Sequence, residues 1–137
     1  LLVGAMRTIF CRGLLATDGW YFDSLAAGNI CFYTNQAGFQ QVSTSAAGAA
    51  VINTWMLVGF TRSGATGKVY KNGVDVTSVV GVHVNPLTSA REFHIGTSDA
   101  HGNSWSGYIW RPRIWSRQLA ADEMQAIFEM ERSLVGV

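Results

Sequence analysis

Charge is scarce in this sequence. Asp, Glu, Lys and Arg supply 14% of the 137 residues, against about 25% in a typical soluble domain, and the net charge is +1. The basic residues form no cluster, which argues against nucleic acid as the main partner, because counterion release requires several neighbouring Lys or Arg side chains. The sequence also lacks an apolar run of about 18 residues, so it predicts no membrane span. The length fits one domain over residues 1–137.

Cysteine is nearly absent, with Cys11 and Cys31 as the two examples. Each lies in a predicted strand, and a third predicted strand, Trp20–Leu25, separates them. In a simple meander the outer strands are about 9 to 10 Å apart, which exceeds the limit of about 7 Å between the Cα atoms of a disulfide. We therefore expect two free, buried thiols. The spacing of Cys and His residues also fits no structural zinc motif.

Helix signals are few before the last part of the chain. Turn signals recur about every 8 to 12 residues, a spacing typical of an all-β sandwich or barrel. The predicted strands are Met6–Arg12, Trp20–Leu25, Ile30–Thr34, Phe39–Thr44, Trp55–Thr61, Lys68–Lys71, Val74–Thr77, Arg91–Gly96 and Gly107–Trp115. Pro112 removes a ladder donor from the last strand, which favours an edge or a bulge there. One helix is predicted, at Ala120–Ser133.

The strongest local signal is Asn72-Gly73, which lies between two runs rich in Val and Tyr. A type I′ turn requires φ > 0 at both central residues, and Asn-Gly tolerates this best. We therefore predict a tight hairpin in which Val69 and Tyr70 face opposite sides. The apolar run Trp55–Thr61 is predicted to be a strand buried on both faces, which completes a three-stranded meander.

Several short motifs follow one another in a fixed order over about residues 55 to 130. They are Trp55-x-x-Val58-Gly59-Phe60-Thr61, Val69-Tyr70-Lys71-Asn72-Gly73-Val74, His94-Ile95-Gly96, Ser106-Gly107-Tyr108-Ile109 and Ile114-Trp115-Ser116-Arg117-Gln118-Leu119 with Asp122-Glu123. This ordered set resembles the laminin G-like, concanavalin A-like jelly-roll family. The resemblance implies an all-β antiparallel β-sandwich with one short C-terminal helix. It also implies that Trp55, Tyr70 and Trp115 are framework side chains and that Arg117 ties down the corner before the helix.

The chain departs from the family pattern in two places. The family commonly has an Asp after the Gly-x-Ile/Leu pair, whereas this chain has Trp110 and Arg111, so the calcium role of that acid does not carry over. The family usually also has one or two opening strands before the equivalent of Met6. The resemblance therefore leads us to expect a domain that lacks its opening strands, or one whose edge is covered by another segment or chain.

The polar loop between the last two predicted strands is the candidate binding site. Trp105 lies in this loop with Asp99, His101 and Asn103, and loops on a rigid sandwich are where binding residues concentrate. Aromatic faces suit the apolar faces of pyranose rings, so Trp105 is a candidate sugar-stacking residue. Trp20 is a second candidate because it follows a tight turn. Core packing is the alternative interpretation of both tryptophans.

A calcium site is a further hypothesis for the same loop. Asp99 and Asn103, together with loop carbonyl groups, would supply the hard oxygen ligands that Ca²⁺ prefers. The alternative is that Asp99 caps a turn through its own side chain. The sequence requires no cofactor, and calcium is the one that it leaves open.

Catalysis on this sandwich requires two carboxylates on one strand face at a fixed separation. No predicted strand carries two acids on one face, because Glu129 and Glu131 belong to the predicted helix. A nucleophile motif of the Gly-x-Ser-x-Gly type is also missing. We therefore expect that the protein is not an enzyme, with a glycoside hydrolase as the least favoured alternative.

Two functions remain open from the sequence. The first is a non-catalytic carbohydrate-binding or adhesion module whose partner is a glycan or another protein surface. The second is a structural or assembly module that self-associates as a homo-oligomer, because unpaired edge strands attract a partner strand. The family resemblance favours an extracellular or particle-surface location in both cases.

Overall fold

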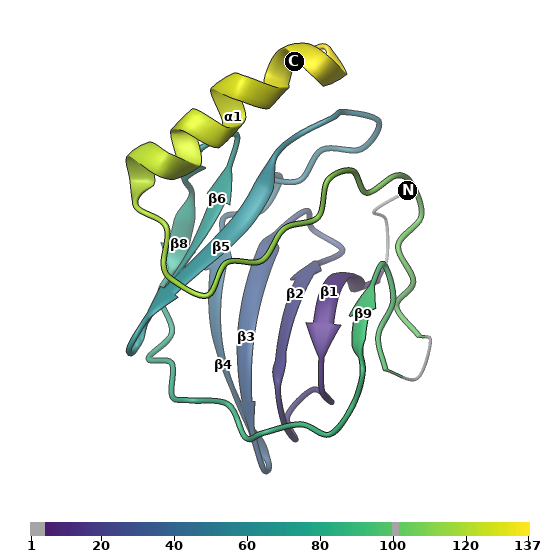
Figure 1. The fold of residues 1–137 in the computed structure, drawn as a ribbon. Coiled ribbons are helices and arrows are strands. Elements are labelled where there is room, and N and C mark those ends of the chain that lie inside the picture. The colour runs from purple at the N-terminus through teal and green to yellow at the C-terminus, as the bar shows by residue number, and fades with distance from the viewer. Residues whose placement is uncertain (1–4, 100–101) are drawn as a thin grey trace.

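The structure is a computed structural model that describes residues 5–99 and 102–137, and its strands form two antiparallel sheets (Figure 1). The larger sheet has the order β8-β4-β3-β2-β1-β9 and the smaller has the order β5-β6-β7. The larger sheet consists of β8 (Thr77–Val79), β4 (Phe39–Ser45), β3 (Ile30–Gln36), β2 (Trp20–Ser24), β1 (Arg7–Arg12) and β9 (Phe93–Ile95). The smaller sheet consists of β5 (Val58–Ser63), β6 (Thr66–Lys71) and β7 (Val74–Asp75). The predicted all-β antiparallel sandwich is confirmed.

The core lies where the larger sheet faces the smaller one. Its buried members are apolar side chains from four strands: Ile9, Phe22, Ile30, Phe32 and Val69. Phe60 of β5 packs against this cluster, and its ring centroid lies 4.2 Å from that of Phe32 and 5.0 Å from that of Phe22. Alternation along each strand sends these residues to the inner face, and burial of their apolar area holds the two sheets together.

The β6–β7 hairpin forms as predicted. Asn72 has φ 50° and Gly73 has φ 79°, as a type I′ turn requires. Val69 lies in the core between the sheets, whereas Tyr70 lies in a separate cluster on the outer face of β6. One detail differs from the prediction, because the expected strand Val74–Thr77 divides. β7 pairs with β6, and the chain then passes to the other sheet, where β8 pairs with β4.

The helix α1 (Ala121–Val135) lies across the smaller sheet and is the predicted C-terminal helix (Figure 1). Met124 of the helix packs with Tyr70 and Leu119 on the outer side of β6. The first turn is capped by Glu123, whose carboxylate accepts a hydrogen bond from the Ala120 N–H at 2.9 Å. Arg117 binds the same carboxylate through two nitrogen atoms at 2.7 and 2.6 Å, so the predicted tie at this corner is present.

The outer face of the larger sheet carries a second cluster of buried side chains, made of Cys11, Tyr21, Cys31 and Tyr33. Both cysteines are buried free thiols, and β2 lies between their strands, as the sequence predicted. Asp23 lies on the same face and is fully buried. Its carboxylate forms no hydrogen bond of standard geometry among the described residues, and the neighbouring Thr8 side chain only partly offsets the effect of burial on its pKa. Burial raises the pKa of Asp23 from 3.8 to about 7.

Two sequence predictions about the aromatic framework are wrong. The expected strand Gly107–Trp115 is absent, and this stretch crosses the molecule without strand pairing. The strand expected from Trp55 begins instead at Val58. As a result Trp55 is 41% exposed and Trp115 is 43% exposed, so neither is the buried framework residue that the family resemblance implied. Within the described residues no helix is long and apolar enough to cross a membrane.

Candidate functional site

A cleft of about 740 Å³ opens between the two sheets and α1. Pockets that hold ligands commonly measure about 300 to 1,000 Å³. Two continuous stretches of the chain, residues 50–62 and 105–119, form most of its wall. In Figure 1 the second stretch is the green segment that runs across the front of the strands toward the helix. The cleft therefore has β5 on one side and, on the other, a segment that forms neither helix nor strand.

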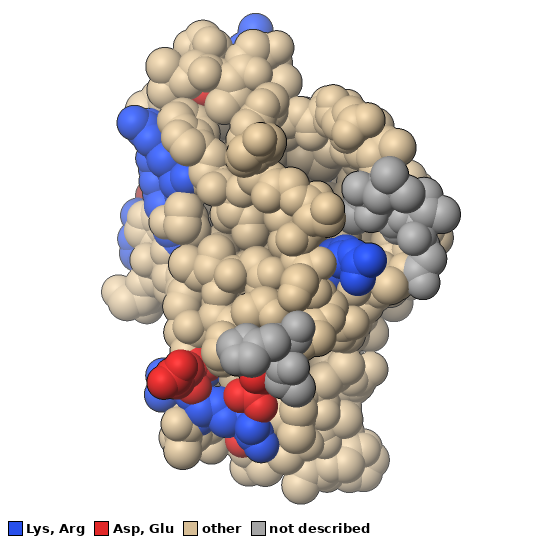
Figure 2. Space-filling model, turned by 90° about the vertical axis from the view of Figure 1, so that its right-hand side faces the viewer, with Lys and Arg blue, Asp and Glu red and all other residues tan. Residues whose placement is uncertain are grey.

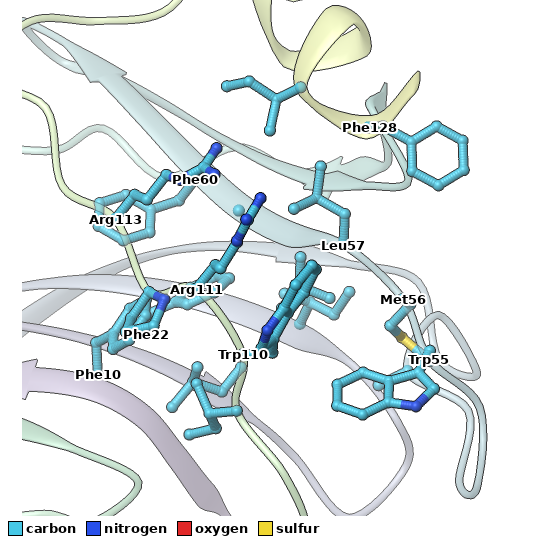
Figure 3. Close-up of a pocket in the computed structure, with 18 of the residues that line it drawn as sticks. Phe10, Phe22, Trp55, Met56, Leu57, Phe60, Trp110, Arg111, Arg113 and Phe128 are labelled. Atoms are coloured by element: carbon cyan, nitrogen blue, oxygen red, sulfur yellow. The ribbon is translucent and has the colours of Figure 1, made fainter. Parts of the chain in front are cut away.

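The floor of the cleft is apolar. Phe10 and Phe22 rise from the larger sheet, and Phe60 lies on β5 above them (Figure 3). Phe22 belongs to the buried core, with 1% of its surface exposed. The floor is therefore the edge of the hydrophobic core, left open by the segment that crosses it.

Four large aromatic side chains line the same cleft and are exposed to solvent. They are Trp55, Tyr108, Trp110 and Trp115. Tyr108 is 85% exposed, and its ring centroid lies 6.3 Å from that of Trp55 with the ring planes inclined by 30°. Water-facing aromatic rings that gather around one cleft are typical of a binding surface, because a soluble domain otherwise buries such area.

The charged groups of the cleft are mainly arginines. Arg111 lies with its guanidinium carbon 4.7 Å from the ring centroid of Trp110, a cation–π contact. Its Nη1 lies 3.5 Å from a carboxylate oxygen of Glu131, and Arg113 forms a closer ion pair with the same oxygen. In Figure 3 Arg111 stands beside Trp110, while Arg113 lies next to Phe60. These contacts fix the arginines and leave N–H donors available for a ligand.

The basic residues form no cluster along the sequence, but the fold concentrates them at the cleft. Of the ten Lys and Arg residues of the chain, those in the cleft lining are Arg7, Arg62, Arg111, Arg113, Arg117 and Arg132. Among the described residues, Glu131 is the one acid in that lining. Figure 2 shows how uncharged another face of the molecule is, with charged side chains confined to small groups. The cleft is thus positively charged in a protein whose net charge is only +1.

The structure separates the site residues that the sequence grouped. Trp105 lines the cleft and packs against the core, and its buried Nε1 has no hydrogen-bond partner among the described residues. Trp20 packs on Phe60 and Phe93, with ring centroids 5.6 and 5.9 Å apart, and it does not line the cleft. His101 lies outside the described residues. The sugar-binding role of these residues stays a prediction.

Asp99 and Asn103 also lie away from the cleft lining. Asp99 forms an ion pair with Arg91, and its other oxygen lies 3.9 Å from Nε2 of His94. The carbonyl oxygen of Asn103 accepts a hydrogen bond from the Thr8 N–H at 2.9 Å. Within the described part of the chain, no three His, Cys, Asp or Glu side chains gather as metal ligands. The calcium prediction is not tested by these contacts, which show only that the Arg91 guanidinium already faces the carboxylate.

The sequence predictions left Tyr108, Trp110 and Trp115 out of the candidate site. A signal was present, because Trp105, Tyr108, Trp110 and Trp115 occur within one short stretch beside Arg111 and Arg113. That stretch also has the β-branched and aromatic composition of a strand, and strand residues were expected to pack inside. The missing pairing of this segment is what turns its aromatic side chains toward the cleft and solvent.

The fold defines a class, an antiparallel β-sandwich domain, and the cleft gives it an exposed aromatic surface. Comparison with protein families matches residues 3–125 to laminin G-like domains of the concanavalin A-like lectin/glucanases superfamily, and the chain belongs to this family. The resemblance inferred from the sequence motifs is confirmed.

One similar solved structure is a crystal structure of residues 221–444 of an S-layer domain-containing protein from Clostridium thermocellum. It is 27% identical to this chain with a TM-score of 0.49, and the match covers 90% of this chain and 63% of that chain. This chain thus spans less than two thirds of the length of that structure. A search of curated proteins gave no match.

Proposed function

We propose that the protein is a non-catalytic carbohydrate-binding or adhesion module and that the aromatic cleft is its binding site. The observation that carries the proposal is the group of solvent-facing aromatic rings around one cleft, led by Tyr108 and Trp110. Aromatic rings bind the apolar faces of sugar rings, and a planar, exposed surface suits them. Binding through such a surface requires no reacting groups.

The polar groups of the cleft support the same function. Sugar hydroxyl groups accept hydrogen bonds well from guanidinium N–H groups, and Arg111 and Arg113 present several at the cleft. Glu131 is held between these two arginines. A glycosidase requires two carboxylates about 5 to 10 Å apart, and Glu131 has no second acid beside it in the described lining. The composition of the cleft therefore favours binding over hydrolysis.

A glycan array with the purified chain tests the proposal, followed by affinity measurements on any glycan that binds. We expect Trp110→Ala to weaken binding about fivefold, since an aromatic contact is worth about 1 kcal/mol. Trp105→Ala tests the loop residue that the sequence favoured. The matched control is Phe39→Ala, because Phe39 is 69% exposed and lies outside the cleft. Absence of binding to every glycan, or equal losses for Trp110→Ala and Phe39→Ala, contradicts the proposal.

An assembly module that self-associates is the second candidate, and one feature of the surface favours it. β8 is an edge strand of the larger sheet, and Val79, Val80, Val82 and Val84 in and after it are each more than 40% exposed. Apolar edge strands pair with other chains unless charge or shape prevents it. The mass of the protein in solution over a range of concentrations tests this candidate. A monomer at all concentrations contradicts it, and a dimer that Val80→Glu dissociates supports it.

A further inference from the structure

β5 forms one wall of the cleft, and its outer edge is unpaired within the described part of the chain. It is the end strand of the smaller sheet, with β6 as its neighbour. The carbonyl oxygen of Leu57 accepts a hydrogen bond from the Asn72 N–H at 2.8 Å, so the backbone of Leu57 faces the β6 side. Antiparallel pairing alternates along a strand. The backbone N–H and C=O groups of Val58, Phe60 and Arg62 therefore point to the free edge.

The opposite wall is also an unpaired backbone. Among the described residues, no backbone N–H or C=O group between residues 106 and 117 forms a hydrogen bond. Consecutive residues of this segment line the cleft, as do consecutive residues of β5. A strand that presented only one face would contribute every second residue. Both walls therefore present their backbone edges to the same space.

We propose that the cleft binds an extended segment of another polypeptide, which pairs with β5 as an added strand of the smaller sheet. Edge-strand addition satisfies the free backbone groups of β5, and such backbone hydrogen bonds supply affinity without a requirement for sequence. The floor under the added strand is formed by Phe10, Phe22 and Phe60. Alternate side chains of the bound segment are therefore apolar, because they lie on this floor.

Charge complementarity determines the remaining side chains of the bound segment, those that point away from the apolar floor. The described lining holds six arginines and one acid. Arg111 and Arg113 reach Glu131 of α1, so these two arginines lie on the helix side of the cleft. Their guanidinium groups share one carboxylate, and a carboxylate of the partner accepts hydrogen bonds from the remaining N–H donors. The segment that fits is thus apolar at every second residue and acidic at residues between them.

This inference goes beyond glycan binding and stands independently of it. It rests on backbone edges and on the apolar floor, whereas the proposed glycan site rests on the solvent-facing aromatic rings. If no glycan binds, the proposal of an added peptide strand is unaffected. The two ligands are distinguished by amide hydrogen exchange, because each protects different backbone amides from exchange.

The test uses a short dye-labelled peptide that alternates valine and glutamate, added to the full chain and followed by fluorescence polarisation. We expect saturable binding, and we expect an N-methylated form of the same peptide to bind about tenfold more weakly because it lacks backbone donors. Arg111→Glu should also weaken binding about tenfold, since it reverses a charge at the cleft. The matched control Lys71→Glu makes the same change outside the cleft lining and should leave binding unchanged.

Amide hydrogen exchange locates the bound segment and keeps the proposal testable if a variant fails to fold. With the unlabelled peptide, the amides of Val58, Phe60 and Arg62 should exchange more slowly, and those of the β8 and β9 edges should not change. Equal affinity for the N-methylated peptide overturns the proposal, as does the absence of binding or protection at β8 or β9 instead of β5. Protection of β5 that rises with protein concentration without any peptide also overturns it, because the occupant is then a second copy of this chain.

Discussion

Phe32 of β3 and Phe60 of β5 stack with ring centroids 4.2 Å apart and ring planes inclined by 11°. This contact joins the two sheets at the centre of the core. Phe60 also lines the cleft, so one ring serves both the core and the floor of the proposed site. The position of the binding surface therefore depends on the packing that holds the sandwich together.

Truncation of Phe32 should destabilise the fold. Phe32 is 3% exposed and packs on Phe60, and the loss of a buried phenylalanine side chain costs about 3 to 5 kcal/mol. We expect Phe32→Ala to lower the free energy of unfolding by that amount in urea denaturation. Phe39→Ala is the control, because its ring is 69% exposed and its loss should cost less than about 0.5 kcal/mol. Similar losses for the two variants would show that the stacked pair does not hold the sheets together.

Alanine substitutions at two glycines distinguish the cost of a positive φ angle from the cost of a steric clash. Gly19 has φ 65° and Gly38 has φ 77°, so alanine is strained at both by about 1 to 2 kcal/mol. At Gly19 an added Cβ would lie 1.7 Å from the carbonyl oxygen of Arg12, whereas at Gly38 it meets nothing within 4 Å. We expect Gly38→Ala to fold with a modest loss and Gly19→Ala to lose several times more. Thermal melting measures both, and equal melting temperatures would contradict the close approach of the Gly19 turn to β1.

Asp23 should make the protein less stable as pH rises. Burial raises the pKa of its carboxyl group from 3.8 to about 7 in the folded state. Between these values the unfolded chain releases the proton while the folded chain keeps it, so stability falls as pH rises through this window. Asp23→Asn should remove the effect and add up to roughly 4 kcal/mol above pH 7 relative to the natural residue. The measurement is urea denaturation of both proteins across this range.

The control for this experiment is Asp122→Asn, which changes an exposed carboxylate at the start of α1. Its pH dependence of stability should follow that of the natural chain. The account of Asp23 is wrong if Asp23→Asn shows the same fall in stability between pH 4 and 7 as the control does.

His83 should resist protonation. Its two ring nitrogens lie 2.9 Å from the hydroxyl oxygens of Thr34 and Ser43, and burial followed by the nearby Arg62 charge lowers its pKa from 6.5 to about 4. The unfolded chain therefore binds a proton first, so the stability from neutral His83 is complete above pH 6.5 and is lost as pH falls toward 4. NMR titration of the imidazole should give a midpoint near 4. A midpoint near 6.5 would show that the ring is exposed to water.

The parts of the fold that the sequence predicted best are those fixed by short-range chemistry. Asn72-Gly73 determines a turn through two positive φ values, and the alternation of Val69 and Tyr70 determines which sheet face each one takes. Strand boundaries in the first half were also close, because a turn signal separates each pair of strands. Local rules decided these elements, so no knowledge of the rest of the molecule was required.

The site was harder to predict because it depends on pairing between distant segments. The stretch Gly107–Trp115 has the composition of a strand, but strand formation requires a partner with free backbone groups. Without pairing, Trp110 and Trp115 become exposed, and the predicted loop residue Trp105 becomes one part of a larger cleft. The composition of the stretch shows that it is rich in aromatic residues. Which of these side chains face water depends on the pairing of the segment, which composition does not predict.

His83 and Asp23 illustrate the same limit for buried polar groups. In the sequence His83 is one of three scattered histidines, and its burial between Thr34 and Ser43 depends on segments 40 to 49 residues apart in the chain. Asp23 follows Trp20, Tyr21 and Phe22 in a strand whose two faces are both covered. Neither residue type predicts burial by itself.

The most direct test of the central claim uses the indole N–H signals of the five tryptophans in an NMR titration with a glycan identified on the array. The account predicts that the signals of Trp55 and Trp110, which face the cleft, shift with saturable amplitude. The signal of Trp20, which packs between Phe60 and Phe93 outside the cleft lining, should remain in place. A shift of Trp20 without any change at Trp55 and Trp110 would contradict the assignment of the cleft as the binding site.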